Sequence, residues 1–310
     1  IKADLTGADL GKNASGVKTT LEGADLTGAI LKNAQMDDVD LTGANLTGAD
    51  LTGATLTDIT IDGASTNFTS AILVGANLEG DILTNVDMEK ADLRGAQLGK
   101  NSGGTATTLT GATLSGANLG KNGSTVTDLS DAILTNAKLI KADLTGADLS
   151  RANLTGTDLT GADLTGATLL TNTFSTTTNL TSAILTDVAG MAGRDMTGVD
   201  LEKADLRGAN LALTDLEDAI LTGANLTNGT AATDLQGATL TNAKLIKADL
   251  TGADLGKNAT GNVKTNLTGA DLTGAILKNA QMDDVNLTGA NLTKADLTGA
   301  TLTDITIDGA

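Results

Sequence analysis

Leucine recurs at every fifth position over most of this chain, with small and polar residues between. Residues 44–58 read Ala-Asn-Leu-Thr-Gly, Ala-Asp-Leu-Thr-Gly and Ala-Thr-Leu-Thr-Asp. An α-helix repeats every 3.6 residues and a strand every two. A period of five would step leucines about 140° around a helix and alternate them between the faces of a strand. The pattern instead predicts short extended sides, each ending in a bend, which coil so that every side turns its leucine inward.

Stacked coils would bury one continuous column of leucines, because no single unit can bury its apolar face alone. The units resemble those of the pentapeptide-repeat family, which read small residue, Asp or Asn, Leu or Phe, Ser, Thr or Arg, and then any residue. The resemblance implies an all-β fold, a right-handed quadrilateral β-helix (a β-solenoid) with about twenty residues per coil and about 15 coils. It also implies that the central residue and the small residue two positions earlier point inward. The predicted inward column comprises Leu5, Leu10, Leu26, Leu31, Met36, Leu41, Leu46, Leu51 and Leu56.

Longer gaps interrupt the five-residue step at recurring places. Four of them open with Gly-Lys-Asn, starting at residues 11, 99, 120 and 256, and another contains Thr-Asn-Gly from residue 227. Gly and Asn tolerate the left-handed backbone of a protruding turn, so we predict short loops or bulged sides on a continuing coil. The gaps separate Leu10 from Leu21, Leu98 from Leu109, Leu119 from Leu129, Leu226 from Leu235, and Leu255 from Leu267.

A second level of repetition covers the two ends of the chain. Residues 1–64 recur as residues 246–310 with five substitutions and one inserted residue, Asn262. No compositional shift or linker divides the chain, which predicts a single continuous β-solenoid over residues 1–310. Both ends lie in the middle of the pattern, without an initiator Met or a signal peptide. We therefore expect a segment of a longer repetitive polypeptide, with any targeting signal outside it.

Composition agrees with a narrow, coiled interior. The chain has two Phe and no Trp, Tyr or Pro, and a larger ring would rarely fit between stacked Leu and Ala. It has no Cys, so no disulfide framework is predicted. No apolar run is long enough to span a membrane, and we expect no membrane insertion. The formal net charge of −18 predicts a surface that repels nucleic acid and anionic lipid and attracts basic partners or divalent cations.

The residue types argue against catalysis. Without His or Cys the chain lacks the commonest general base and the strongest nucleophile. Its carboxylates belong to a repeated outward position. Gly-Lys-Asn is not a Walker A motif, which needs a Ser or Thr after the Lys. We predict that the protein is not an enzyme, with no catalytic residue and no cofactor.

The densest acidic stretch of the sequence is a candidate calcium-binding site. It contains Asp37, Asp38 and Asp40, and its copy has Asp283 and Asp284 but Asn286. Carboxylate oxygens suit Ca²⁺, although neither an EF-hand loop nor a glycine-rich calcium nonapeptide is present. The alternative is that these residues form the outward face of the repeat, where interleaved Asn and Thr relieve the repulsion between stacked carboxylates. The second interpretation is favoured, and the five aspartates are kept as candidate calcium ligands.

Two functions fit these features. The first is a structural protein that forms an extracellular or cell-surface fibre, with head-to-tail or lateral copies of itself as partners. Low sequence diversity and near-perfect duplication favour it. The second follows from the resemblance, since some pentapeptide-repeat proteins mimic DNA and bind DNA gyrase through an acidic surface. Those members are compact dimers with a capping helix, and this sequence shows neither feature.

Overall fold

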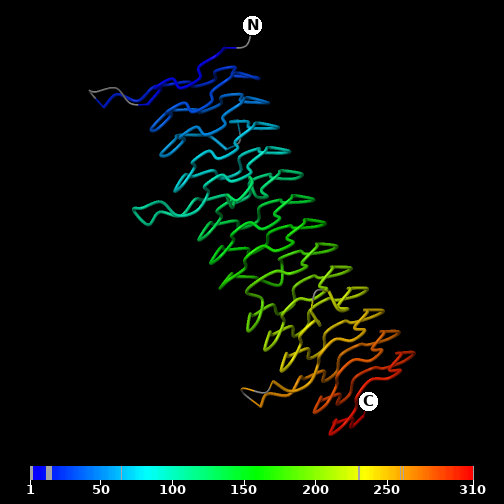
Figure 1. The fold of residues 1–310 in the computed structure, drawn as a ribbon. Helices are drawn as coiled ribbons and strands as arrows, with labels where there is room; N and C mark the ends of the chain where they lie inside the picture. Colours follow the sequence, from blue (N-terminus) through cyan, green and yellow to red (C-terminus); the bar gives the residue numbers. More distant parts are fainter. Residues whose placement is uncertain are drawn as a thin grey trace. The chain divides into compact units, whose positions relative to one another are not determined.

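The computed structural model describes residues 3–11, 16–63, 65–229, 231–258, 260 and 262–309. The predicted loop positions 12–15, 230, 259 and 261, and positions 1, 2, 64 and 310, lie outside the described residues. The chain forms two compact units, Ile1–Asp158 and Leu159–Ala310. Each unit is built of coils laid one on the next (Figure 1). The expectation that one solenoid runs through both units stays a prediction.

Each coil has four short sides. No described residue lies in a helix or an extended strand, because a five-residue side pairs with the next coil through a single parallel bridge. In uninterrupted coils paired residues are twenty positions apart, which corresponds to four sides of five residues, and an interruption lengthens this separation, as between Ile82 and Thr108. In the first unit one coil pairs Asp25 with Asn45, Ile30 with Asp50, Gln35 with Thr55, and Asp40 with Thr60. In the second unit, Asp195 pairs with Asp215, Asp200 with Ile220, and Asp205 with Asn225.

In the side 44–48 every backbone N–H has a partner, as a buried backbone requires. Ala44 N–H donates to the carbonyl three residues earlier and closes the bend. Three further N–H groups tie the side to the coils before and after it. These bonds run from Asn45 to the carbonyl of Ala24 (2.9 Å), from Leu46 to that of Asn67 (2.7 Å), and from Gly48 to that of Thr69 (3.0 Å).

The fifth N–H explains why Asp or Asn precedes the leucine. Thr47 N–H donates to Asn45 Oδ1 at 3.1 Å, and the Thr47 hydroxyl donates to the same atom at 2.6 Å. Asp50 holds Thr52 in the same way, at 3.1 and 2.6 Å. Asp and Asn side chains favour such turns because they can reach the backbone two residues on. The outward polar position is therefore part of the backbone hydrogen-bonding scheme.

The residue two after the leucine takes the left-handed conformation that the bend needs. Gly48 has φ 62°, and its counterpart in the duplicated segment, Lys294, has φ 61°. A residue with a side chain costs about 1–2 kcal/mol more than glycine in this conformation. The bend thus prefers glycine without requiring it.

The predicted inward column lies largely in the interior. Leu31, Met36, Leu41, Leu46, Leu51 and Leu56 are fully buried, and Leu26 is 8% exposed. Leu5 and Leu10 differ, since both are partly exposed. Leu5 N–H donates to the carbonyl of Ile30 in the following coil at 2.7 Å. Its duplicated counterpart Leu250 lies between coils on both sides and is fully buried. Burial of a central leucine therefore depends on coils stacked on both of its faces.

The interruptions form small hairpins that leave and re-enter the coil. Antiparallel bridges join Lys100 to Ala106, Asn122 to Thr125, and Asn258 to Val263. Figure 1 shows the hairpin near residue 100 extending beyond the coils on either side of it. The prediction of short loops on a continuing coil is confirmed for these three gaps.

A buried threonine stands where each chain segment re-enters the coil, at the position that usually holds alanine. Thr107 Oγ1 accepts the Gly80 N–H at 2.8 Å and lies 2.7 Å from the carbonyl oxygen of Gly99, where the hairpin leaves. A single hydroxyl thus joins the two ends of the hairpin to the preceding coil. The same arrangement recurs at Thr127, Thr233 and Thr265.

We expect Thr107→Val to destabilise the first unit by about 1–3 kcal/mol, because it removes the hydroxyl and leaves buried polar groups without their partner. The shape of the side chain is nearly unchanged. The measurement is the urea unfolding midpoint, followed by circular dichroism. Thr52→Val is the matched control, since the Thr52 hydroxyl serves only the turn at Asp50. Equal midpoints for the two variants would contradict the role assigned to Thr107.

Candidate functional site

The structure distributes the predicted calcium ligands of the first copy among different partners. Asp37 accepts a hydrogen bond from the Thr57 hydroxyl. Asp38 lies 3.4 Å from Lys18 Nζ. Asp40 Oδ1 accepts the Thr42 hydroxyl at 2.6 Å, and this bond, with the Thr42 N–H, lowers the pKa of Asp40.

The second copy repeats this arrangement. The hydroxyls of Thr303 and Thr301 donate to Asp283 and lower its pKa. Lys257 and Lys264 lie 2.7 and 2.9 Å from Asp284 and lower the pKa of that carboxyl. Over the part of the chain that the structure describes, no three acidic side chains are placed to share a metal ion. The aspartates named from the sequence therefore lie in side-chain bonds within the coil.

A different acidic residue stands out in the first unit. Asp81 occupies the small inward position two residues before Leu83, where the repeat usually has alanine. Its side chain is buried, with 2% of its surface exposed. Oδ1 accepts the Ile59 N–H from the preceding coil at 3.2 Å. Oδ2 is buried without a hydrogen-bond partner among the described residues.

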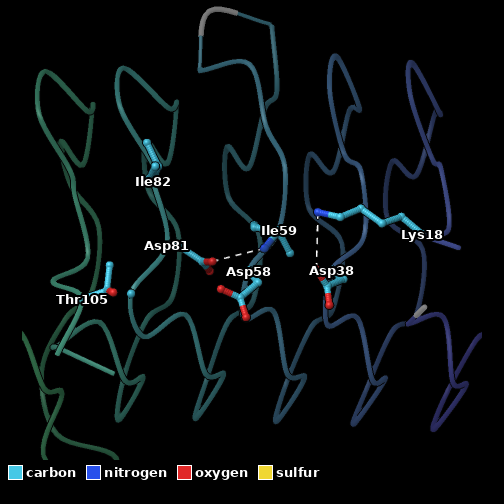
Figure 2. A pocket seen from close by; sticks show the side chains of 8 residues that line it. Lys18, Asp38, Asp58, Ile59, Asp81, Ile82 and Thr105 are labelled. Atoms are coloured by element: carbon cyan, nitrogen blue, oxygen red, sulfur yellow. Dashed lines mark hydrogen bonds and ion pairs between the residues drawn. The ribbon is translucent and has the colours of Figure 1, made fainter. Parts of the chain in front are cut away.

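Asp81 lines a cavity of about 390 Å³ at the edge of the coils. Ile59 and Ile82 contribute apolar surface, and Thr105 closes the side nearest the hairpin 100–106. Figure 2 shows the Asp81 carboxylate directed toward Ile59, with Asp58 beside it. Farther along the same row, Lys18 reaches Asp38.

The electrostatics of this cavity are unusual for an aspartate. Burial raises the pKa of Asp81 to about 8. The negative charges of Asp58 and Asp37 add to the rise in pKa, and the backbone N–H groups of Ile59 and Asp58 oppose it. At neutral pH Asp81 is therefore largely protonated.

The sequence contains the signal for Asp81, but the repeat pattern hides it. Reading Asp as an outward residue is correct at the position before leucine, and Asp81 lies one position earlier, at the inward site. A charged residue at a position predicted to be buried is a candidate for function. The cavity itself also needs the hairpin and Lys18, whose proximity follows only from the stacking of coils.

The five-residue sides, the parallel bridges and the buried leucine column define a four-sided β-solenoid. The family model described as pentapeptide repeats matches 8 copies, over residues 21–58, 64–98, 127–166, 195–229, 231–257 and 265–304. The chain belongs to the pentapeptide-repeat family, as its residues predicted. Membership implies the right-handed form of the quadrilateral β-helix, while the count of about 15 coils stays a prediction.

Solved structures of other pentapeptide-repeat proteins are similar to this chain. HetL from the cyanobacterium Nostoc sp. strain PCC 7120, involved in heterocyst differentiation regulation, is 32% identical, with 88% of this chain and 87% of HetL covered and a TM-score of 0.32. Rfr23 from the cyanobacterium Cyanothece 51142 is 24% identical over 58% of this chain and 91% of its own, with a TM-score of 0.14.

Full-length QnrB1, a plasmid-mediated fluoroquinolone resistance protein, is 15% identical, with 93% of this chain and 91% of QnrB1 covered and a TM-score of 0.20. No curated protein sequence matches this chain. Among the described residues, no helix is long and apolar enough to cross a membrane.

Proposed function

We propose that this chain is a structural protein whose coils stack into an extracellular or cell-surface fibre, with further copies of the chain as its partners. The outward Asp, Asn and Thr side chains support this proposal because they form hydrogen bonds within the repeat itself. They hold the backbone of each side, as Asp50 holds Thr52. The proposal assigns the protein no catalytic activity and no affinity for nucleic acid.

The regular stacking of similar coils within the chain carries the proposal. Leu56 is fully buried, and its N–H donates to the carbonyl of Asn77 in the following coil at 2.8 Å. Its counterpart Leu302 is 41% exposed and nearby Ile307 is 56% exposed, and both lie in the last coil of this sequence. A further coil on this face would bury both side chains, whether it belongs to the continuation of a longer repetitive polypeptide or to a further copy of the chain. Full burial of such a residue contributes about 1.5–3 kcal/mol, and the backbone ladder would gain partners as well.

The test is self-association of the chain. We expect assemblies that grow with concentration in sedimentation velocity and appear as thin filaments in electron microscopy. The double variant Leu302→Lys/Ile307→Lys should remain monomeric, whereas Leu170→Lys, at a half-exposed outward position, should assemble normally. A chain that is monomeric at every concentration, or assembly that ignores the double variant, would refute the proposed stacking. Antibody labelling of intact producing cells tests the proposed location.

The alternative is a DNA mimic that binds a topoisomerase such as DNA gyrase. The net charge of −18 favours it. Against it, acidic and neutral residues interleave along the outward ladders. One such ladder runs through Asp25, Asn45, Asn67, Asp87 and Thr113. Inhibition of gyrase supercoiling by the monomeric chain at near-stoichiometric concentration would favour the mimic, and unchanged supercoiling in excess protein would rule it out.

A further inference from the structure

The Asp81 carboxylate is satisfied on one side only. Oδ1 has the Ile59 N–H at 3.2 Å, whereas Oδ2 is buried and has no hydrogen-bond partner among the described residues. Buried polar atoms in native proteins nearly always have a partner, from protein, water or ligand. The small residue that normally stands at this position would fill the coil without this cost. A buried aspartate is therefore costly as a purely structural residue, and its ionised form needs a further hydrogen-bond donor or a positive charge.

The cavity beside Asp81 is large enough for a small organic group. Its volume of about 390 Å³ lies within the range of small-molecule sites. Its lining combines carboxylates with the apolar side chains of Ile59 and Ile82, and Ile82 is 66% exposed at the mouth. A ligand with a polar head and a short alkyl stem matches this combination.

The charge of the lining favours a cation. Asp38, Asp58 and Asp81 face the cavity, and Lys18 faces it from the other end. Lys18 lies 3.4 Å from Asp38, so its charge is balanced there. Asp58 and Asp81 remain as two acidic groups at the opposite part of the cavity, beside Thr105 (Figure 2).

An organic ammonium fits this lining better than a hard metal ion does. Ca²⁺ takes 6–8 oxygen ligands, and no three acidic side chains among the described residues are placed to share an ion. The isoleucine side chains have no atom that could coordinate a metal ion. An ammonium group needs one or two strong acceptors and gains from apolar contact along its stem.

We propose that this cavity binds a primary alkylammonium group, whose positive charge pairs with the ionised Asp81 carboxylate while its methylene stem packs against Ile59 and Ile82. Asp58 supplies a second negative charge at the entrance. The same chemistry is presented by a free alkyl diamine and by a lysine side chain of a partner protein. This site is independent of the proposed coil stacking, because its lining lies between residues 18 and 105, whereas the stacking is tested at Leu302 and Ile307.

Binding is coupled to a proton. Burial holds the pKa of Asp81 at about 8 in the empty cavity, with Asp37, Asp38, Asp58 and Lys18 as the charged groups around it. Below that pH the ammonium must displace the Asp81 proton, which passes to solvent as the carboxylate forms. Apparent affinity should therefore fall as pH decreases from about 8, approaching about tenfold per pH unit.

The experiment is calorimetric titration of the full chain at pH 8.5 with 1,5-diaminopentane and, separately, with N-acetyl-lysine N-methylamide. Saturable binding at one site is expected, with proton release at pH 7 detected in buffers of different ionisation enthalpy. The tighter of the two probes identifies the source of the ammonium. Asp81→Asn and Asp81→Ala should each weaken binding by at least about tenfold, because both remove the anionic acceptor.

Asp87→Asn is the matched control, since it makes the same charge change at an outward position of the next side and should alter binding less than about twofold.

A purely structural role for Asp81 would be recognised from the stability of the chain at different pH values. The folded-state pKa of Asp81 is above the ordinary value of 3.8, so its contribution to stability is full below that pH and is lost as pH rises to about 8. At pH 8, Asp81→Asn should therefore leave the free energy of unfolding unchanged or increase it, whereas a purely structural role predicts a decrease.

Three results would overturn the proposal. The first is the absence of saturable amine binding at millimolar concentration in the unmodified chain. The second is binding that Asp81→Asn leaves unchanged. The third is Ca²⁺ binding that is tighter than amine binding and competes with it, which would assign the cavity to a metal ion.

Discussion

Leu51→Lys is expected to unfold the coils around it, with the largest loss of stability of any single change considered for this chain. Leu51 is fully buried in the central column. Truncation of a buried leucine to alanine already costs about 2–5 kcal/mol, and a charge placed in the same position adds its desolvation. Because each coil is stabilised by its neighbours, the loss should spread along the stack. The measurement is the urea unfolding midpoint, followed by circular dichroism.

Thr52→Lys is the control for this variant, one position away in sequence. The Thr52 side chain lies on the outer face, where its hydroxyl donates to Asp50 at 2.6 Å. Loss of this half-exposed hydrogen bond should cost no more than about 1 kcal/mol, because the lysine side chain extends into solvent. If both variants unfold at the same urea concentration, the inward register of the repeat is wrong.

Gly63→Ala should produce the second largest effect. A Cβ atom at Gly63 would overlap the carbonyl oxygen of Thr84 and lie 2.7 Å from its carbonyl carbon. These are backbone atoms of a neighbouring segment, which cannot rotate away as a side chain would. The loss in free energy of unfolding should therefore exceed that of ordinary overpacking, which is about 1–3 kcal/mol. A shift in the thermal unfolding midpoint, measured by calorimetry, checks this expectation.

Gly48→Ala separates crowding from backbone conformation. Gly48 has φ 62°, and a Cβ there would have open space around it. Only the conformational cost of about 1–2 kcal/mol applies. The chain itself places Lys294 at the equivalent position, with φ 61°. Gly63 does not have a positive φ, so a Gly48 variant as unstable as the Gly63 variant would show that close approach to Thr84 costs no more than a left-handed φ.

The sequence predicted the fold well because its strongest signal is also the physical cause of the fold. A leucine every five residues excludes helix and strand and leaves a coil of short sides, and Leu31 to Leu56 lie where that reasoning placed them. The partial exposure of Leu5 and Leu10 follows from the number of coils stacked on them, which a local repeat does not contain.

The candidate site was harder to predict. The calcium candidates Asp37 and Asp38 attracted attention because they are adjacent in sequence, yet one bonds Thr57 and the other Lys18. The cavity at Asp81 gathers side chains from coils and a hairpin far apart in the chain. Their meeting depends on how many residues each insertion adds, because this number sets the sequence separation of the residues that stack on one another.

The threonines that close the hairpins have a consequence for the way such a chain can change. At Thr107, one hydroxyl joins the departing and returning strands of the hairpin to the coil beneath. The path between those strands can then lengthen while the coil keeps its register, since each doubling of a flexible loop costs only about 0.6 kcal/mol. Each such corner is a natural graft point, where a foreign peptide can be displayed outward from an unaltered scaffold.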